Sequence, residues 1–288
     1  MSETATLLPG LSAIAERYRG ILCDVWGVIH NGVTAFSPAC DALARFRAAG
    51  GSVVLLTNAP RPSGPIYEQL DSLGVSRDAY DSIVTSGDAT RAMLIEKGIT
   101  RVYHIGPERD LTLYEDSAMT LTDPEAAEVV VCTGLFDDDT ETPEDYHPRL
   151  RALIERGLPF ICANPDIVVE RGHTLIWCAG ALARDYAAFG GEVVILGKPH
   201  APIYGTALGR LGEAVGGDLA TSDVLAIGDG LKTDVTGAVN QGLDTLFITA
   251  GIHAADFGPS DSPDAEKVAA RLAEEGLAVV GAMPRLSW

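Results

Sequence analysis

ILCDVWGVIHNG, residues 21 to 32, is the stretch that decides the fold. An apolar lead-in ends in Asp24, and a run rich in glycine and polar residues follows. Such a lead-in is typical of a strand in a sheet that is covered on both faces. Asp24 then stands at the carboxyl end of a strand, where parallel sheets bind their ligands. Two positions on, the chain carries Trp26.

Short apolar runs alternate with helical patterns along the rest of the chain. The expected strands are 20–23, 52–57, 101–105, 129–132, 159–163, 193–196, 224–227 and 245–248. The expected helices are 38–49, 65–73, 89–97, 148–156, 181–189 and 203–214, with a final surface helix within 264–277. This order predicts an α/β protein with a mostly parallel sheet.

Composition limits the classes of function. The 288 residues are 47% hydrophobic, which is enough for a large core and about two domains. A net charge of −19 without a basic patch argues against nucleic acid and against anionic membranes as partners. The first residues, MSETATLLPG, carry acid instead of a positive leader, and no apolar run reaches the length of a membrane span. We therefore expect a cytoplasmic protein.

Five cysteines are widely spaced and mostly lie among apolar residues. Their odd number and spacing favour reduced core thiols over disulfides or a zinc site.

Polar residues end four of the expected strands. They are Asp24, the pair Thr57 and Asn58, Lys198, and Asp229 with Asp234 five residues on. Carboxyl ends of parallel strands share one edge, so these side chains are predicted to converge. Gathered carboxylates repel one another unless a hard cation such as Mg²⁺ neutralises them. Each residue alone also suits a turn or a helix cap, but the whole set predicts a Mg²⁺-dependent phosphoryl-transfer site with an aspartate nucleophile.

These motifs resemble those of the haloacid dehalogenase-like superfamily, and within it the class IIA phosphatases. The resemblance runs from about residue 21 to residue 253. It is carried by the DxxGV of 24–28, the TNAPRP of 57–62, the ANPD of 163–166, the GKPH of 197–200 and the GDGLKTD of 228–234. It implies a Mg²⁺-dependent hydrolase of a small phosphorylated metabolite that acts through an aspartyl-phosphate.

The resemblance also implies roles and domains. Asp24 would be both nucleophile and metal ligand, and Lys198 would neutralise charge at the phosphate. The remaining metal ligands would be the Trp26 backbone carbonyl, Asp229 and, directly or through water, Asp234. Thr57 and Asn58 would hold phosphate oxygens, with Ala59 beside them at the substrate. Arg61 adjoins this loop and is expected either to add positive potential there or to be a surface charge. The Rossmann-like core would comprise 1–85 and 191–288, with an inserted α/β cap at 86–190. A homodimer is expected by analogy.

Trp26 departs from the family, which normally has an aspartate there to protonate the leaving oxygen. An indole N–H cannot act as an acid or base near neutral pH. The activity is therefore slow, or another residue such as His30 supplies the proton, or the fold now only binds a phosphorylated ligand; transfer to an acceptor other than water is a further alternative. For His30 the alternative, which we prefer, is a structural role with a backbone hydrogen bond in the loop.

In the cap, Asn164 and Asp166 are expected to shape the substrate pocket, although a turn capped by Asp166 explains them as well. Gly180 opens an expected helix whose free amides would suit an anion; a plain helix start is the alternative.

Overall fold

The structure, a computed structural model, describes residues 5–172 and 174–288. The chain forms two compact units. The first comprises the described residues up to Thr57 together with Glu68–Val84 and Tyr204–Trp288, and the second comprises Asn58–Tyr67 and Thr85–Ile203. Each unit contains one sheet with parallel strand pairs, and helices lie between the strands in sequence. The expected α/β class is therefore confirmed. The predicted core and cap boundaries, with the cap at 86–190, stay a prediction.

The first unit is built on a six-stranded sheet in the order β13-β12-β11-β1-β2-β3. Its strands are β1 (Gly20–Cys23), β2 (Ser52–Thr57), β3 (Ser82–Thr85), β11 (Val224–Gly228), β12 (Asp244–Ile248) and β13 (Gly281–Met283). β1 lies between β11 and β2 and pairs in parallel with both. Every residue of these three strands is buried, as their apolar sequences predict.

The longer helices of this part of the chain lie where they were expected. They are α1 (Ser37–Ala48), α2 (Ser63–Ser72), α6 (Ala201–Val215) and α8 (Ala265–Glu274). The five-residue helix α7 (Thr236–Asn240) was not expected. α8 begins where the Asp264 side chain accepts hydrogen bonds from the amides of Glu266 and Lys267. Its Val268 and Leu272 then pack beside Phe247 of β12.

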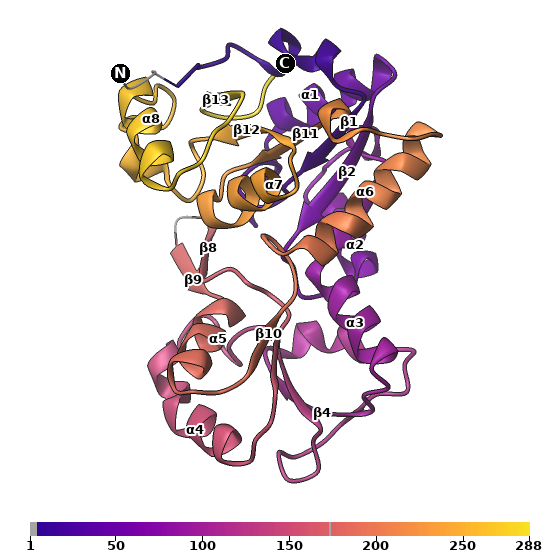
Figure 1. The fold of residues 1–288 in the computed structure, drawn as a ribbon, viewed down its shortest axis with the longest axis vertical. Helices are drawn as coiled ribbons and strands as arrows, with labels where there is room; N and C mark the ends of the chain where they lie inside the picture. Colours follow the sequence, from indigo (N-terminus) through magenta and orange to yellow (C-terminus); the bar gives the residue numbers. More distant parts are fainter. Residues whose placement is uncertain (1–4, 173) are drawn as a thin grey trace. The chain divides into compact units, whose positions relative to one another are not determined.

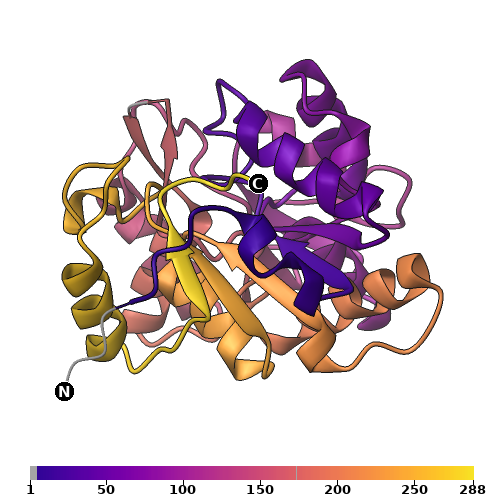
Figure 2. The same cartoon turned by 90° about the horizontal axis from the view of Figure 1, so that it is seen from above.

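The start of the described chain covers the edge of the same sheet. Leu7 forms a bridge with Ala282 of β13, and the Leu8 N–H donates to the Ala282 carbonyl at 2.8 Å. Figure 2 shows this indigo segment running beside the yellow strand β13. The contact satisfies backbone groups that an open sheet edge would expose.

The second unit has its own five-stranded sheet, in the order β10-β7-β6-β4-β5. The strands are β4 (Arg101–Ile105), β5 (Thr120–Leu121), β6 (Val129–Cys132), β7 (Phe160–Cys162) and β10 (Val193–Ile195), and all four neighbouring pairs are parallel. Helices α3 (Ser86–Glu96), α4 (His147–Glu155) and α5 (Ala179–Ala188) accompany it.

Alternate residues of this sheet enter two separate cores. Val129 and Val131 pack with Leu94 of α3, whereas Val130 and Cys132 pack with residues of α4 and α5. Figure 1 shows α4 and α5 on one side of the sheet and α3 on the other. Because both faces are covered, the strands read as continuous apolar runs.

All eight expected strands are present, but five further strands among the described residues were missed. β3, β5 and β13 are only two to four residues long. The remaining two, β8 (Val168–Arg171) and β9 (Thr174–Trp177), form an antiparallel pair with charged and half-exposed residues. Such short or polar strands lack the apolar run on which the prediction depends.

No helix in the described ranges 5–172 and 174–288 is long and apolar enough to cross a membrane.

Candidate active site

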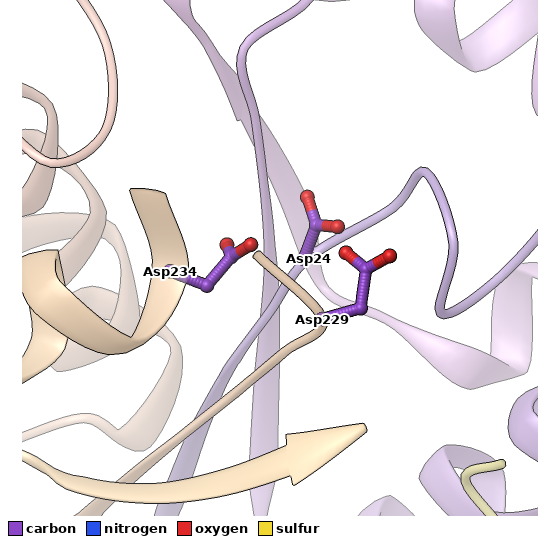
Figure 3. Close-up of side chains that lie close together, drawn as sticks. All are labelled: Asp24, Asp229 and Asp234. Atoms are coloured by element: carbon purple, nitrogen blue, oxygen red, sulfur yellow. The ribbon is translucent and has the colours of Figure 1, made fainter. Parts of the chain in front are cut away.

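Three aspartates gather at the carboxyl edge of the first unit's sheet. Asp24 follows β1 and Asp229 follows β11, and the Asp24 N–H donates to the Ile227 carbonyl at 2.8 Å. Asp234 lies in a single π-helical turn, Leu231–Val235, directly after the same strand. One carboxylate oxygen from each aspartate lies within 4.8 Å of the other two. Figure 3 shows the three side chains close together. The predicted convergence of the three carboxylates is therefore present.

Backbone amides hold two of these carboxylates in place. The Ile252 N–H donates to Oδ2 of Asp229 at 2.9 Å, and the Gly230 N–H donates to Oδ2 of Asp234 at 3.0 Å. The Thr233 hydroxyl lies 3.3 Å from that same Asp234 oxygen. These contacts aim the carboxylates before any ligand arrives, which is what a metal site requires of its surroundings.

The three carboxylates fit a hard divalent cation. All are buried, with 6 to 7% of each residue exposed, so their mutual repulsion is poorly screened. Oxygen ligands alone, without cysteine or histidine, suit a cation such as Mg²⁺ better than zinc or copper. The arrangement can therefore bind a divalent metal ion at the end of β1.

Trp26 and His30 lie beside this site in one loop. Their rings meet edge to face with centroids 5.0 Å apart. His30 is 1% exposed, and its Nδ1 accepts a hydrogen bond from the Gly32 N–H at 2.9 Å. Burial lowers the pKa of His30 to about 4, so the ring is neutral at physiological pH. These contacts favour the structural role for His30 over proton donation.

The second unit brings together another predicted set, Asn58, Asp166 and Lys198. Asn58 Nδ2 donates to Oδ1 of Asp166 at 2.9 Å, and Asn58 Oδ1 accepts from the Lys198 N–H at 2.7 Å. Asn58 and Lys198 are both 3% exposed. Thr57, the last residue of β2, is likewise buried and belongs to the first unit.

The remaining predicted substrate residues serve local contacts. The Ala59 carbonyl accepts from the Gly87 N–H, and Asn164 Oδ1 accepts from the Asp166 N–H at 3.2 Å. The Gly180 N–H donates to the Asp166 carbonyl at 3.1 Å. The amide of Gly180 is therefore engaged by the protein itself, which favours the plain helix start over an anion site.

Arg61 has a partner that the sequence did not reveal. Its Nε lies 3.7 Å from Oδ1 of Asp110, which is 3% exposed. Burial raises the pKa of Asp110, while the charges of Arg109 and Arg61 lower it. Asp110 follows β4 after five residues, and no motif marks it. Only its position one loop beyond an apolar strand could have drawn attention to it.

Two family models match the chain. One, described as haloacid dehalogenase-like hydrolase, covers residues 21–120, and a related one covers residues 195–274. A crystal structure of a haloacid dehalogenase-like hydrolase from Brucella suis 1330 is 49% identical, covers 97% of this chain and 100% of its own, and superposes with a TM-score of 0.87.

Curated relatives agree with these matches. The 5'-nucleotidase YutF of Bacillus subtilis is 28% identical over 82% of this chain and 89% of its own length. The acid sugar phosphatase of Staphylococcus saprophyticus is 26% identical over 82% of this chain and 88% of its own. The chain therefore belongs to the haloacid dehalogenase-like hydrolases, and within them to the class IIA phosphatases.

Proposed function

We propose that this phosphatase hydrolyses a small phosphorylated metabolite through an aspartyl-phosphate on Asp24, with Mg²⁺ as its cation. The observation that carries the proposal is the buried cluster of Asp24, Asp229 and Asp234 at one edge of a parallel sheet. The class of substrate follows the curated relatives, whose names specify a nucleotide and an acid sugar phosphate. The two named substrates have the phosphoryl group in common and differ elsewhere. This fits a core that recognises the phosphoryl group and a cap, proposed at 86–190, that recognises the remainder of the substrate.

Asp24 supplies the nucleophile. One carboxylate oxygen attacks phosphorus, the bond between phosphorus and the leaving oxygen breaks, and an acyl phosphate forms on Asp24. Water then attacks that phosphorus, which releases phosphate and regenerates the carboxylate. A bound Mg²⁺, held by the three aspartates and the Trp26 carbonyl, would offset the charge of the phosphoryl oxygens during both steps.

Lys198 and the strand-end residues complete the proposed chemistry. By the family's motifs, Lys198 offsets negative charge on the nucleophile and phosphate, and Thr57 donates a hydrogen bond to a phosphate oxygen. These two roles rest on the GKPH and TNAPRP motifs.

Trp26 sets the expected rate. Without an aspartate at this position, the leaving oxygen must take its proton from solvent, which removes a contribution of about 10² to 10⁴ in rate. We therefore propose a slow hydrolase that favours esters with good leaving groups. The missing base also lengthens the life of the aspartyl-phosphate, so transfer to an alcohol acceptor can compete with hydrolysis.

The direct test is hydrolysis of p-nitrophenyl phosphate and of nucleotide and sugar phosphates with Mg²⁺. The wild type is expected to release phosphate, and Asp24→Asn to be inactive because an amide is not a nucleophile here. Added glycerol would reveal transfer as glycerol phosphate. A wild type that binds Mg²⁺ and phosphate but turns over none of these esters would contradict the proposal.

A further inference from the structure

The amide of Asn58 holds the backbone of Lys198. Asn58 Oδ1 accepts the Lys198 N–H at 2.7 Å, and Asn58 Nδ2 lies 3.4 Å from the Lys198 carbonyl. The two residues are 140 positions apart, and both are almost completely buried. The side-chain amide of Asn58 therefore anchors the backbone of the loop that follows β10.

Asp166 determines which way round this amide lies. An ionised carboxylate only accepts hydrogen bonds, so it selects the NH₂ group of Asn58, which donates to it at 2.9 Å. The carbonyl oxygen of the amide must then face the Lys198 N–H. A neutral residue at position 166 would allow the amide to turn over, which would place an N–H against an N–H.

Asp166 is itself fixed from the other side. Asn164 Oδ1 accepts its N–H, and the Gly180 N–H donates to its carbonyl. A Cβ at position 180 would lie 2.2 Å from the Pro165 carbonyl oxygen, so only glycine lets the helix start approach this loop. The start of α5 thus fixes the loop of residues 164–166, and Asp166 of this loop in turn holds Asn58.

The loop that carries Lys198 has little freedom. Gly197 has φ +113°, and a Cβ there would lie 2.6 Å from Asn58 Oδ1 and 2.9 Å from Ser86 Oγ. The Ser86 hydroxyl donates to the Leu196 carbonyl just before it. A change in the orientation of Asn58 therefore acts directly on the backbone from which the lysine projects.

We infer that Asp166 is a positioning residue for Lys198 and acts through Asn58. This inference rests on the proposed function, in which Lys198 offsets charge at the phosphate. It gives Asn58 and Asp166 roles different from the phosphate contact and the substrate pocket that their motifs suggest. Misplacement of a catalytic group by about 1 Å can cost on the order of 100-fold in rate, so the effect belongs mainly in kcat.

A reciprocal exchange of the two side chains tests the inference. Asp166→Asn frees the amide to turn over, and Asn58→Asp sets two carboxylates against each other. In the double variant Asn58→Asp/Asp166→Asn, the new carboxylate accepts from both the Lys198 N–H and the new amide. Each single variant is expected to lose at least about tenfold in kcat with little change in KM, and the double variant to regain most of it.

A second measurement does not depend on activity. Hydrogen exchange at the Lys198 amide, followed by NMR, is expected to accelerate in each single variant and to slow again in the double variant. Asp123→Asn, at an exposed aspartate of the same unit, is the matched control and should change neither readout.

The outcomes separate this inference from the proposed function. Single variants with wild-type kcat and exchange would overturn the inference, as would a rise in KM alone or a double variant no better than the singles. An inactive wild type would overturn the proposed function, while exchange at Lys198 would still decide whether Asp166 holds this loop.

Discussion

A Cβ atom on Gly251 would lie 1.8 Å from Oδ2 of Asp229. The same oxygen accepts the N–H of the next residue, Ile252, at 2.9 Å. The loop after β12 therefore forms the wall against which this carboxylate rests. The loop contacts the Asp229 carboxylate through the backbone of Gly251 and Ile252. These contacts involve no side chain, so the sequence of the loop does not reveal them.

Gly251→Ala is expected to displace the Asp229 carboxylate, because the new methyl group and the oxygen cannot occupy the same space. We expect a loss of Mg²⁺ affinity and at least a tenfold loss of phosphatase activity, measured by calorimetric titration and by phosphate release. Gly209→Ala, at an exposed position of helix α6 with open space at its Cβ, is the control. It should keep full activity and gain about 0.5–1 kcal/mol in stability. Equal Mg²⁺ affinity in Gly251→Ala and wild type would show that the carboxylate does not need this wall.

Trp26→Asp should restore a general acid to the site. We expect rates on alkyl phosphates to rise by about 100-fold, because poor leaving groups depend most on protonation, and rates on p-nitrophenyl phosphate to rise much less. The measurement is kcat/KM across a series of esters whose leaving groups differ in pKa. Asparagine has nearly the same shape as aspartate but carries no acidic proton. The variant Trp26→Asn therefore separates the effect of proton transfer from the effect of removing the indole ring. If both variants show the same leaving-group dependence as wild type, proton transfer does not limit the reaction.

Removal of the metal should destabilise the wild type and leave a charge-reduced variant almost unchanged. Asp229→Asn relieves repulsion among three buried carboxylates, so without metal it is expected to be at least as stable as wild type. Saturating Mg²⁺ should stabilise the wild type by about 2.7 kcal/mol at 100 times Kd and leave the variant almost unchanged. Thermal unfolding with EDTA and with Mg²⁺ measures both. Equal stabilisation of the two proteins by Mg²⁺ would place the ion elsewhere.

The second unit should lose stability in mild acid through His104. Its Nδ1 lies 2.9 Å from the Tyr114 hydroxyl, and burial lowers its pKa from 6.5 to about 4. The unfolded chain therefore takes up the proton first as pH falls, so this contribution to stability is complete above pH 6.5 and is lost between pH 6.5 and 4.

His104→Asn should reduce this dependence on pH by up to ~1.4 kcal/mol per pH unit within that window. Urea unfolding at several pH values measures the slope. A slope in His104→Asn equal to that of wild type would mean that His104 is not the group that titrates.

The eight expected strands and the gathering of the three aspartates could be predicted because each depends on local pattern. β1 and β2 have the expected ends, since their apolar runs stop where the polar strand-end residues begin. Helix α3 begins earlier than expected, at Ser86, because the Thr85 hydroxyl accepts the Asp88 N–H and caps it. The pair β8 and β9 was missed, since its charged residues carry no strand pattern.

The fold class, the family and the gathering of the three carboxylates could be predicted from the sequence, because strand ends and motif spacing are local features of the chain. Tertiary structure was needed to find which partners the other predicted residues contact. It showed that His30 is buried with Nδ1 occupied, that Arg61 pairs with Asp110, and that Asp166 contacts Asn58, which lies 108 residues away. Such roles depend on which hydrogen-bonding groups are already satisfied, and that is settled by contacts between segments far apart in sequence.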